Sequence, residues 1–180
     1  MAIPRLTPDQ TVQVSELVAQ YITAQRGRYL PRALPLSAQL KGDMEGFFSP
    51  QLLDGARLLV LTGERVANPA FYPMLTNLGF NNLPDQSAMA AITFSDVVVS
   101  HGPFTAGLLF HELVHVEQYR QLGVQRFAEF YVRGFLNGGS YEAIPLEVNA
   151  YTLGGRFEEH PGRRFSVSDE VQGWMTEGRL

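Results

Sequence analysis

The chain begins with a pattern of apolar and polar positions that predicts an amphipathic helix. Thr7 precedes Pro8 and Gln10, which suits a helix start with proline in the first turn and a capping box. We therefore expect a helix from Pro8 to about Gly27. Apolar residues recur along it at helical spacing: Val14, Leu17, Val18, Tyr21 and Ile22.

Three short runs in the middle of the chain have the composition of β-strands. Residues 57–62 (RLLVLT) predict a buried strand. Residues 90–94 and 97–100 predict two more, with Ser95 and Asp96 between them in a tight turn or a bulge. Weaker helical signals surround these strands, in residues 37–48, in one turn after Ser49-Pro50, and in residues 68–79.

From Thr105 onward the pattern becomes helical. One long helix is expected to end at Gly123, and a second covers residues 125–136. Pro145 opens a third helix, which runs to about Leu153. The order of helix, strands and helices predicts an α+β fold, in which a small mixed sheet packs on the long helix and further helices follow it.

The composition fits one domain with a substantial core. The chain has 180 residues, of which 45% are hydrophobic and 18% charged, and these values argue against a disordered chain. We expect a single domain over residues 1–180. Residues 1–47 would be an N-terminal helical extension and residues 156–180 a loop-rich C-terminal tail, in which Ser168 caps a short helix that carries Trp174.

Charge and cysteine content exclude several function classes. The formal net charge is −4, with 14 Lys+Arg and 18 Asp+Glu, and no basic run is longer than Arg163-Arg164. We therefore expect no nucleic-acid partner and no membrane binding. The chain has no cysteine, which rules out disulfides, thiol catalysis and cysteine-based zinc sites. No signal-peptide pattern opens the sequence, so we expect a cytoplasmic protein unless a leader has been removed.

The clearest chemical signal is the run His111-Glu112-Leu113-Val114-His115 on the long predicted helix. His111 and His115 are four residues apart, about 400 degrees of helical rotation, so both imidazoles leave one face one turn apart. This spacing lets two nitrogens bind one Zn²⁺. Glu112 lies roughly 100 degrees from His111. It could take a proton from an activated water and deliver it to a leaving amine.

The rest of that helix agrees with a site on one face. Leu109, Leu113 and Val116 cluster opposite the two histidines, and Gln118 continues the histidine stripe, where it could rim the site. A lone histidine is usually an ordinary hydrogen-bonded residue. Two histidines that flank a glutamate in this register, on a helix with an apolar opposite face, predict zinc binding.

A catalytic zinc site needs a third protein ligand and one open position. A third histidine six residues after the second, as in metzincins, is excluded because that position is Gln121. Glu147, in the first turn of the third predicted helix, is the first candidate, and Glu142 in the preceding loop is the second. His160 and His101 are the other imidazoles of the chain.

The run LLFHELVHVEQ resembles the core of HExxH zinc peptidases of the gluzincin type. In these peptidases a glutamate on a later helix, commonly in a Glu-x-x-Ala pattern, completes the site, and Glu147-Val148-Asn149-Ala150 matches that pattern. More narrowly, residues 48–151 resemble a small bacterial metallopeptidase-like domain of unknown function, including a strand segment that corresponds to Ala91-Ile92-Thr93-Phe94.

The resemblance implies a zincin-like fold, a zinc cofactor and a peptide or protein substrate. His111, His115 and Glu147 would hold the metal, and Glu112 would be the general base. Many gluzincins place an aspartate four residues after the ligand glutamate, as a hydrogen-bond acceptor for a ligand histidine, but here that position is Tyr151. Tyr151 could support a ligand, donate to the transition state or pack in the core.

Two other interpretations stay open. The protein could be a non-catalytic zinc-stabilised domain that binds a partner, or a metal-free interaction domain. Glu112 argues against both, because a structural zinc site needs no base between its ligands. The apolar residues of the tail, Phe165, Val167 and Trp174, must also be covered. Burial preference favours the back of the core, and the alternative is that a terminal segment restricts the cleft.

Overall fold

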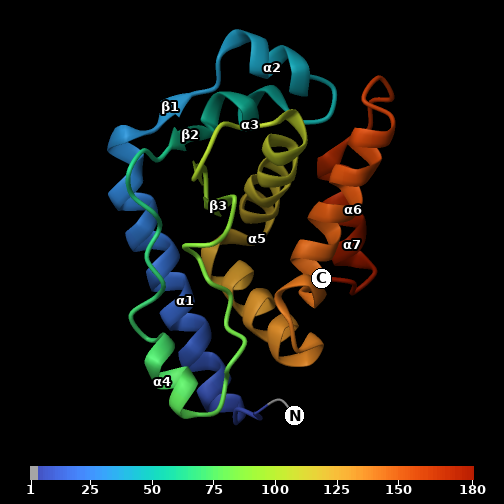
Figure 1. Ribbon diagram of the computed structural model, residues 1–180. Helices are drawn as coiled ribbons and strands as arrows, with labels where there is room; N and C mark the ends of the chain where they lie inside the picture. The colour runs from blue at the N-terminus through green and yellow to red at the C-terminus, as the bar shows by residue number, and fades with distance from the viewer. Residues whose placement is uncertain (1–3) are drawn as a thin grey trace.

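The computed structural model describes residues 4–180, so residues 1–3, the start of the expected N-terminal extension, lie outside the described part. Helices and a small sheet alternate along the chain (Figure 1). The elements are α1 (Pro8–Tyr29), η1 (Leu30–Arg32), β1 (Leu34–Pro35), α2 (Ala38–Met44), α3 (Pro50–Gly55), β2 (Arg57–Val60), α4 (Tyr72–Asn77), β3 (Ala91–Phe94), β4 (Val97–Ser100), α5 (Ala106–Gly138), η2 (Tyr141–Ala143), α6 (Pro145–Glu159) and α7 (Val167–Thr176). The α+β prediction is confirmed.

The sheet has four strands in the order β1-β2-β4-β3. β2 pairs with β4 in parallel, whereas the β1–β2 and β3–β4 pairs are antiparallel, so the sheet is mixed as expected. Ser95 has a positive φ of 62° in the connection between β3 and β4, which places it in a tight turn. Because β3 is last in the order, one of its edges has no neighbouring strand among the described residues, and the Thr93 carbonyl oxygen there accepts a hydrogen bond from the hydroxyl of Tyr119.

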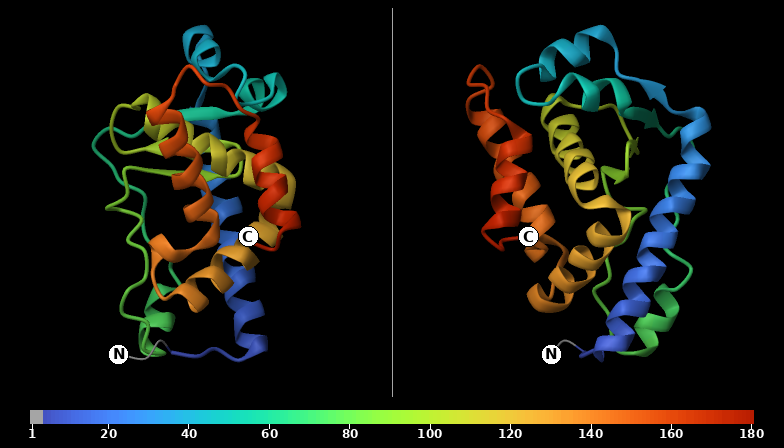
Figure 2. Two further views of the ribbon diagram at one scale, coloured as in Figure 1. Left: turned by 90° about the vertical axis from the view of Figure 1, so that its right-hand side faces the viewer. Right: turned by 180° about the vertical axis from the view of Figure 1, so that it is seen from behind.

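The sheet and α5 separate two apolar clusters. Residues of β4 alternate between them, because Val97 and Val99 pack with α1 whereas Val98 packs with α2, α3 and the first half of α5. Helices α1 and α6 lie on opposite sides of α5, and α7 packs with α6 (Figures 1 and 2). The first half of α5 therefore lies at the centre of the molecule.

Helix α1 is packed into the domain along its length. Thr7 and Gln10 form the predicted capping box, and the helix continues two residues past Gly27. Ile22 and Tyr29 are buried, and the ring of Tyr29 stacks on Phe94 of β3 with 6.0 Å between centroids. Helix α1, which lies in the segment described from sequence as an extension, thus packs as part of the apolar core.

Helix α5 changes direction at the glycine that was expected to end it. Gly123 has φ 72° and ψ 164°, far from helical values, so the two halves of α5 correspond to the two helices predicted from sequence. Thr105 caps the first half through a hydrogen bond from the Leu108 amide. A glycine accepts this backbone conformation without the steric cost that a side chain would add.

The C-terminal part is more helical than expected. Helix α6 runs through Gly154 and Gly155, where the sequence predicted its end, and stops at Glu159. Two glycines cost a helix interior about 2 kcal/mol relative to alanine, but burial of Leu153 and Phe157 on either side of them outweighs that cost. The final helix α7 is capped by Ser166 instead of Ser168. None of the described helices is long and apolar enough to cross a membrane.

Candidate metal centre

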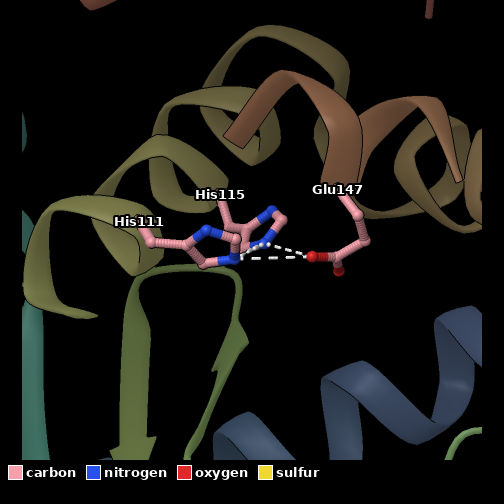
Figure 3. Close-up of side chains that lie close together, drawn as sticks. All are labelled: His111, His115 and Glu147. Carbon is pink, nitrogen blue, oxygen red and sulfur yellow. Dashed lines mark hydrogen bonds and ion pairs between the residues drawn. The ribbon is translucent and has the colours of Figure 1, made fainter. Parts of the chain in front are cut away.

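Three predicted ligands converge on one point between α5 and α6. His111 and His115 lie on the first half of α5, and Glu147 lies in the first turn of α6, with its carboxylate directed at the two imidazoles (Figure 3). The Nε2 atoms of the histidines are 3.1 Å apart, and Glu147 Oε2 is 3.4 Å from that of His111 and 3.3 Å from that of His115. These three side chains are close enough to bind one metal ion.

The spacing of the three ligand atoms fits a tetrahedral ion. With metal–ligand bonds of about 2.0–2.1 Å, neighbouring ligands in a tetrahedral zinc site are about 3.3 Å apart. The three observed separations, from 3.1 to 3.4 Å, form one face of such a tetrahedron. Glu147 Oε2 is also buried, with the two histidine nitrogens as its ion-pair partners and no shorter hydrogen bond from the described residues. A buried carboxylate oxygen is costly unless a cation balances it, either a metal ion or a protonated imidazole.

The alternative ligands point elsewhere. Glu142 and His160 are exposed and do not join the cluster. His101 is held by the backbone, since its Nε2 accepts a hydrogen bond from the Val66 amide and its Nδ1 lies 2.6 Å from the carbonyl oxygen of Met89. The choice of Glu147 over Glu142 therefore agrees with the geometry.

Gln118 orients the imidazole of His115. Its side-chain nitrogen donates to Leu146 O and to Asn149 Oδ1, both 2.9 Å away on α6. Its oxygen must then accept, and it lies 2.8 Å from His115 Nδ1. In the neutral imidazole that nitrogen carries the proton, which leaves Nε2 with a lone pair toward the cluster for a metal ion. Gln118 is fully buried behind the ligand, so the expectation that it rims the site is wrong.

The electrostatics of these three side chains favour a cation between them. Burial would lower the pKa of His115, but the Glu147 carboxylate, with smaller contributions from Glu112 and Gln118, outweighs it and raises this pKa to about 9. Burial would raise the pKa of Glu147, but the two histidines hold it well below its usual range. A proton or a metal ion shared by the three side chains removes the repulsion between their lone pairs.

Glu112 lies beside the cluster without joining it. Its side chain is buried, and its Oε2 accepts a hydrogen bond of 2.7 Å from the hydroxyl of Thr93 on β3. The same hydroxyl is 3.2 Å from the Glu112 carbonyl oxygen. Thr93 thus fixes one oxygen of Glu112, and the other accepts no hydrogen bond from the described residues. A carboxylate held in this way beside a metal site can act as a proton carrier.

Two cavities meet at Glu112. The first, which we call the inner pocket, has a volume of about 90 Å³ and reaches from His115 and Glu147 to α1 and the second half of α5. The second, the outer groove, has a volume of about 510 Å³ and runs between β3, the start of α5 and α6. Met89, Ala91, Glu112 and Tyr141 line both of them.

Two tyrosines lie at the site in different positions. Tyr151 is 55% exposed, so it does not pack in the core, and its ring centroid lies 4.5 Å from that of His111. Tyr141, on η2, lines both cavities and interacts with Glu147. Tyr141 could not be predicted from the sequence, because a single tyrosine in a loop carries no periodic or motif signal.

The terminal segments lie on opposite sides of this site. Val18, Tyr21 and Ile22 of α1 line the inner pocket. In the C-terminal segment, Phe165 and Val167 pack with the apolar face of α5 at the back of the core, which is the position that burial preference favoured. Trp174 is buried and lines neither cavity. The apolar residues of the tail therefore do not cover the cleft, whereas Glu158, at the start of the same segment, lines the outer groove.

Comparison of the chain with protein-family models, with curated proteins and with solved structures found no match.

Proposed function

We propose that this protein is a zinc-dependent metallopeptidase with a zincin-like fold and a gluzincin-type ligand set. The observation that carries the proposal is the triangle formed by two histidine nitrogens and the otherwise unpartnered Oε2 of Glu147. Its dimensions suit zinc, and two imidazoles with one carboxylate are a donor set of catalytic zinc sites. Three protein ligands leave a fourth position open.

The residues around the triangle suit hydrolysis. Zinc at this site would supply the Lewis acid that lowers the pKa of a water and polarises a carbonyl group. Glu112 would take a proton from that water as its oxygen attacks the carbonyl carbon, and would pass the proton to the amide nitrogen as the C–N bond breaks. Thr93 would keep the carboxylate in place through the hydrogen bond to Oε2.

A peptide substrate is supported by the position of the edge strand. Ala90 and Ala91 line the outer groove, and Ala91 to Phe94 line the inner pocket, so the two cavities follow β3 along one edge. Where this edge faces the outer groove, an extended peptide could pair with it as a further strand, with its backbone hydrogen bonds independent of side-chain identity. Its scissile bond would then lie where the cavities meet, beside Glu112.

The test combines metal analysis with turnover. Protein purified without chelator should hold one zinc per chain, and His111→Ala, His115→Ala and Glu147→Gln should lower that ratio strongly, whereas the control Glu142→Gln should not. A mixed peptide library, followed by mass spectrometry, should show cleavage that a chelator stops and zinc restores.

Glu112→Gln separates catalysis from metal binding. It should keep the zinc and lower the cleavage rate by about 10²–10⁴-fold, because proton transfer is lost while the ligands stay. Zinc binding without any cleavage by the wild-type protein would favour a zinc-stabilised binding domain, and an absence of bound metal would contradict the whole proposal.

A further inference from the structure

The outer groove has a floor made of glycines. Gly154 and Gly155 of α6 and Gly107 of α5 line it. A Cβ atom at Gly154 or Gly155 would meet nothing within 4 Å, so packing in the protein does not require glycine at either position. Each costs the helix about 1 kcal/mol relative to alanine. Glycine in that situation suits the close approach of a bound backbone.

A carboxylate with no ion-pair partner among the described residues lies at the far end of this groove. Glu158 crosses over the start of α5, where a Cβ atom at Gly107 would lie only 2.0 Å from its Oε1. Glu158 is exposed and forms no ion pair within residues 4–180. The neighbouring Arg156 is paired with Glu170 on α7. The residues that line the groove include neither lysine nor arginine.

At the metal end of the groove a second carboxylate faces the same space. Glu112 is only 4% exposed and lines the groove, with one oxygen bound by Thr93 and the other free of hydrogen bonds from the described residues. The groove is thus continuous with the metal cluster at one end and has the carboxylate of Glu158, without a basic lining residue, at the other. The charge at the Glu158 end favours a cationic group there over a neutral or anionic one.

The distance between the two ends of the groove corresponds to a few residues of a bound, extended peptide. Gly107 precedes His111 by about one helical turn, or about 6 Å along the axis. An extended peptide advances about 3.3 Å per residue, so the groove spans roughly two residues between the cluster and Glu158. A longer path would add a third residue at most.

We propose that the outer groove binds an extended peptide segment with a cationic group two or three residues from the scissile bond, and that Glu158 recognises this group. The position of the scissile bond in this inference rests on the proposed function. The preference of the groove for a positive charge does not. The cation is a lysine or arginine side chain or a free amino terminus, because all three present N–H donors and a positive charge.

Binding is measured first, on the Glu112→Gln protein as purified, so that no substrate is consumed. The ligands are heptapeptides of otherwise uncharged residues. Each position in turn holds either lysine or norleucine, and each peptide is made with a free and with an acetylated amino terminus. At one position, lysine should bind about threefold to fivefold more tightly than norleucine at low salt, and the difference should shrink at high salt. If the free amino terminus is recognised, acetylation should remove the preference instead.

Two further substitutions assign the preference. Adding Glu158→Gln should abolish it, and adding Glu158→Lys should shift it to glutamate. Glu159→Gln is the matched control, because Glu159 is the next exposed carboxylate on α6 and does not line the groove. Equal binding of lysine and norleucine peptides, or a preference that survives Glu158→Gln, would overturn the inference.

Cleavage by the wild-type protein then separates this inference from the proposed function. If zinc-dependent cleavage occurs, peptides with the favoured lysine should show a higher kcat/KM, mainly through KM. If no peptide is cleaved but the charge preference depends on Glu158, the groove assignment stands and the peptidase assignment fails. If peptides are cleaved without any charge preference, the peptidase assignment stands and the groove assignment fails.

Discussion

The two faces of the first half of α5 contain equally buried side chains of opposite character. On one face, Leu109, Phe110 and Leu113 are fully buried among apolar neighbours. Phe110 stacks on Phe157 of α6 with 4.4 Å between ring centroids, and meets Phe47 edge to face at 5.3 Å. These apolar contacts stabilise the fold through close packing of complementary shapes, and they do not require a hydrogen-bonding partner at a fixed position.

On the other face, His115, Gln118 and Glu112 are buried as deeply, but each depends on a specific partner. Asn149 and the carbonyl oxygen of Leu146 bind Gln118, and Thr93 binds Glu112. Glu147 Oε2 has only the two histidine nitrogens beside it. Buried polar side chains are tolerated when charge and hydrogen bonds balance them, so the cluster of one carboxylate and two imidazoles marks where a cation belongs.

The largest expected effect is on the apolar face. Phe110→Ala should lower the free energy of unfolding by about 3–5 kcal/mol, because it removes a fully buried ring and leaves a cavity. The zinc content of the folded protein should not change. Urea unfolding and metal analysis check the two statements. Phe130→Ala, at a half-exposed position on the second half of α5, should cost clearly less. A loss of zinc with Phe110→Ala would show that the two faces are not independent.

Metal removal tests the polar face as a whole. If zinc binds the folded chain and not the unfolded chain, a zinc concentration about 1,000 times the dissociation constant raises the free energy of unfolding by about 4 kcal/mol. A chelator should therefore lower the melting temperature of the wild-type protein. It should not affect His115→Ala, which lacks a ligand. Equal melting temperatures of the wild-type protein with and without chelator would contradict the assignment of the cluster as a metal site.

Gln118 provides a sharper test. Gln118→Leu should lower zinc affinity by about 10–100-fold, because His115 loses the partner that fixes its proton on Nδ1. Gln121→Leu is the matched control, since Gln121 lies on the same helix and donates to Glu117 and to the Ser168 carbonyl, away from the cluster. Competition with a chromophoric chelator measures both. Equal losses of affinity would mean that Gln118 acts through general stability only.

The smallest effect concerns the two tyrosines. Tyr141→Phe should lower kcat about tenfold with little change in KM, because Tyr141 lies where the cavities meet and can donate to a developing oxyanion. Tyr151→Phe should change kcat less than Tyr141→Phe does, since Tyr151 lies exposed against the outer side of His111. The reverse order would return the donor role to Tyr151.

Local signals predicted most of the elements and the ligand pair. His111 and His115 share one helix face, so their relation follows from helical geometry alone. Glu147 was found through its Glu-x-x-Ala setting after a proline, because no periodicity connects two helices. Capping at Thr7 and Thr105 was also local. Each of these features depends on neighbours within a few residues.

Features that depend on long-range packing were missed. The role of Gln118 arises from partners on α6, and that of Tyr141 from the meeting of two cavities. Gly154 and Gly155 were misread as a helix end because propensity neglects the burial of their neighbours. Similarly, the position of α1 against the inner pocket could not be inferred, because an apolar stripe on a helix does not specify which other element covers it.

The arrangement of α5 and α6 also affects how the protein folds. Leu146 meets Gln118 at one end of the pair and Glu158 meets Gly107 at the other, so α6 runs antiparallel to the first half of α5. Along the chain, the second half of α5 lies between these two helices, so the ligands come from segments far apart in the chain, as the parallel strands β2 and β4 also do. Closing such a loop costs conformational entropy, and bound zinc would hold the two helices together after that cost has been met. We therefore expect bound zinc to slow unfolding, so that the unfolding rate falls as the zinc concentration rises.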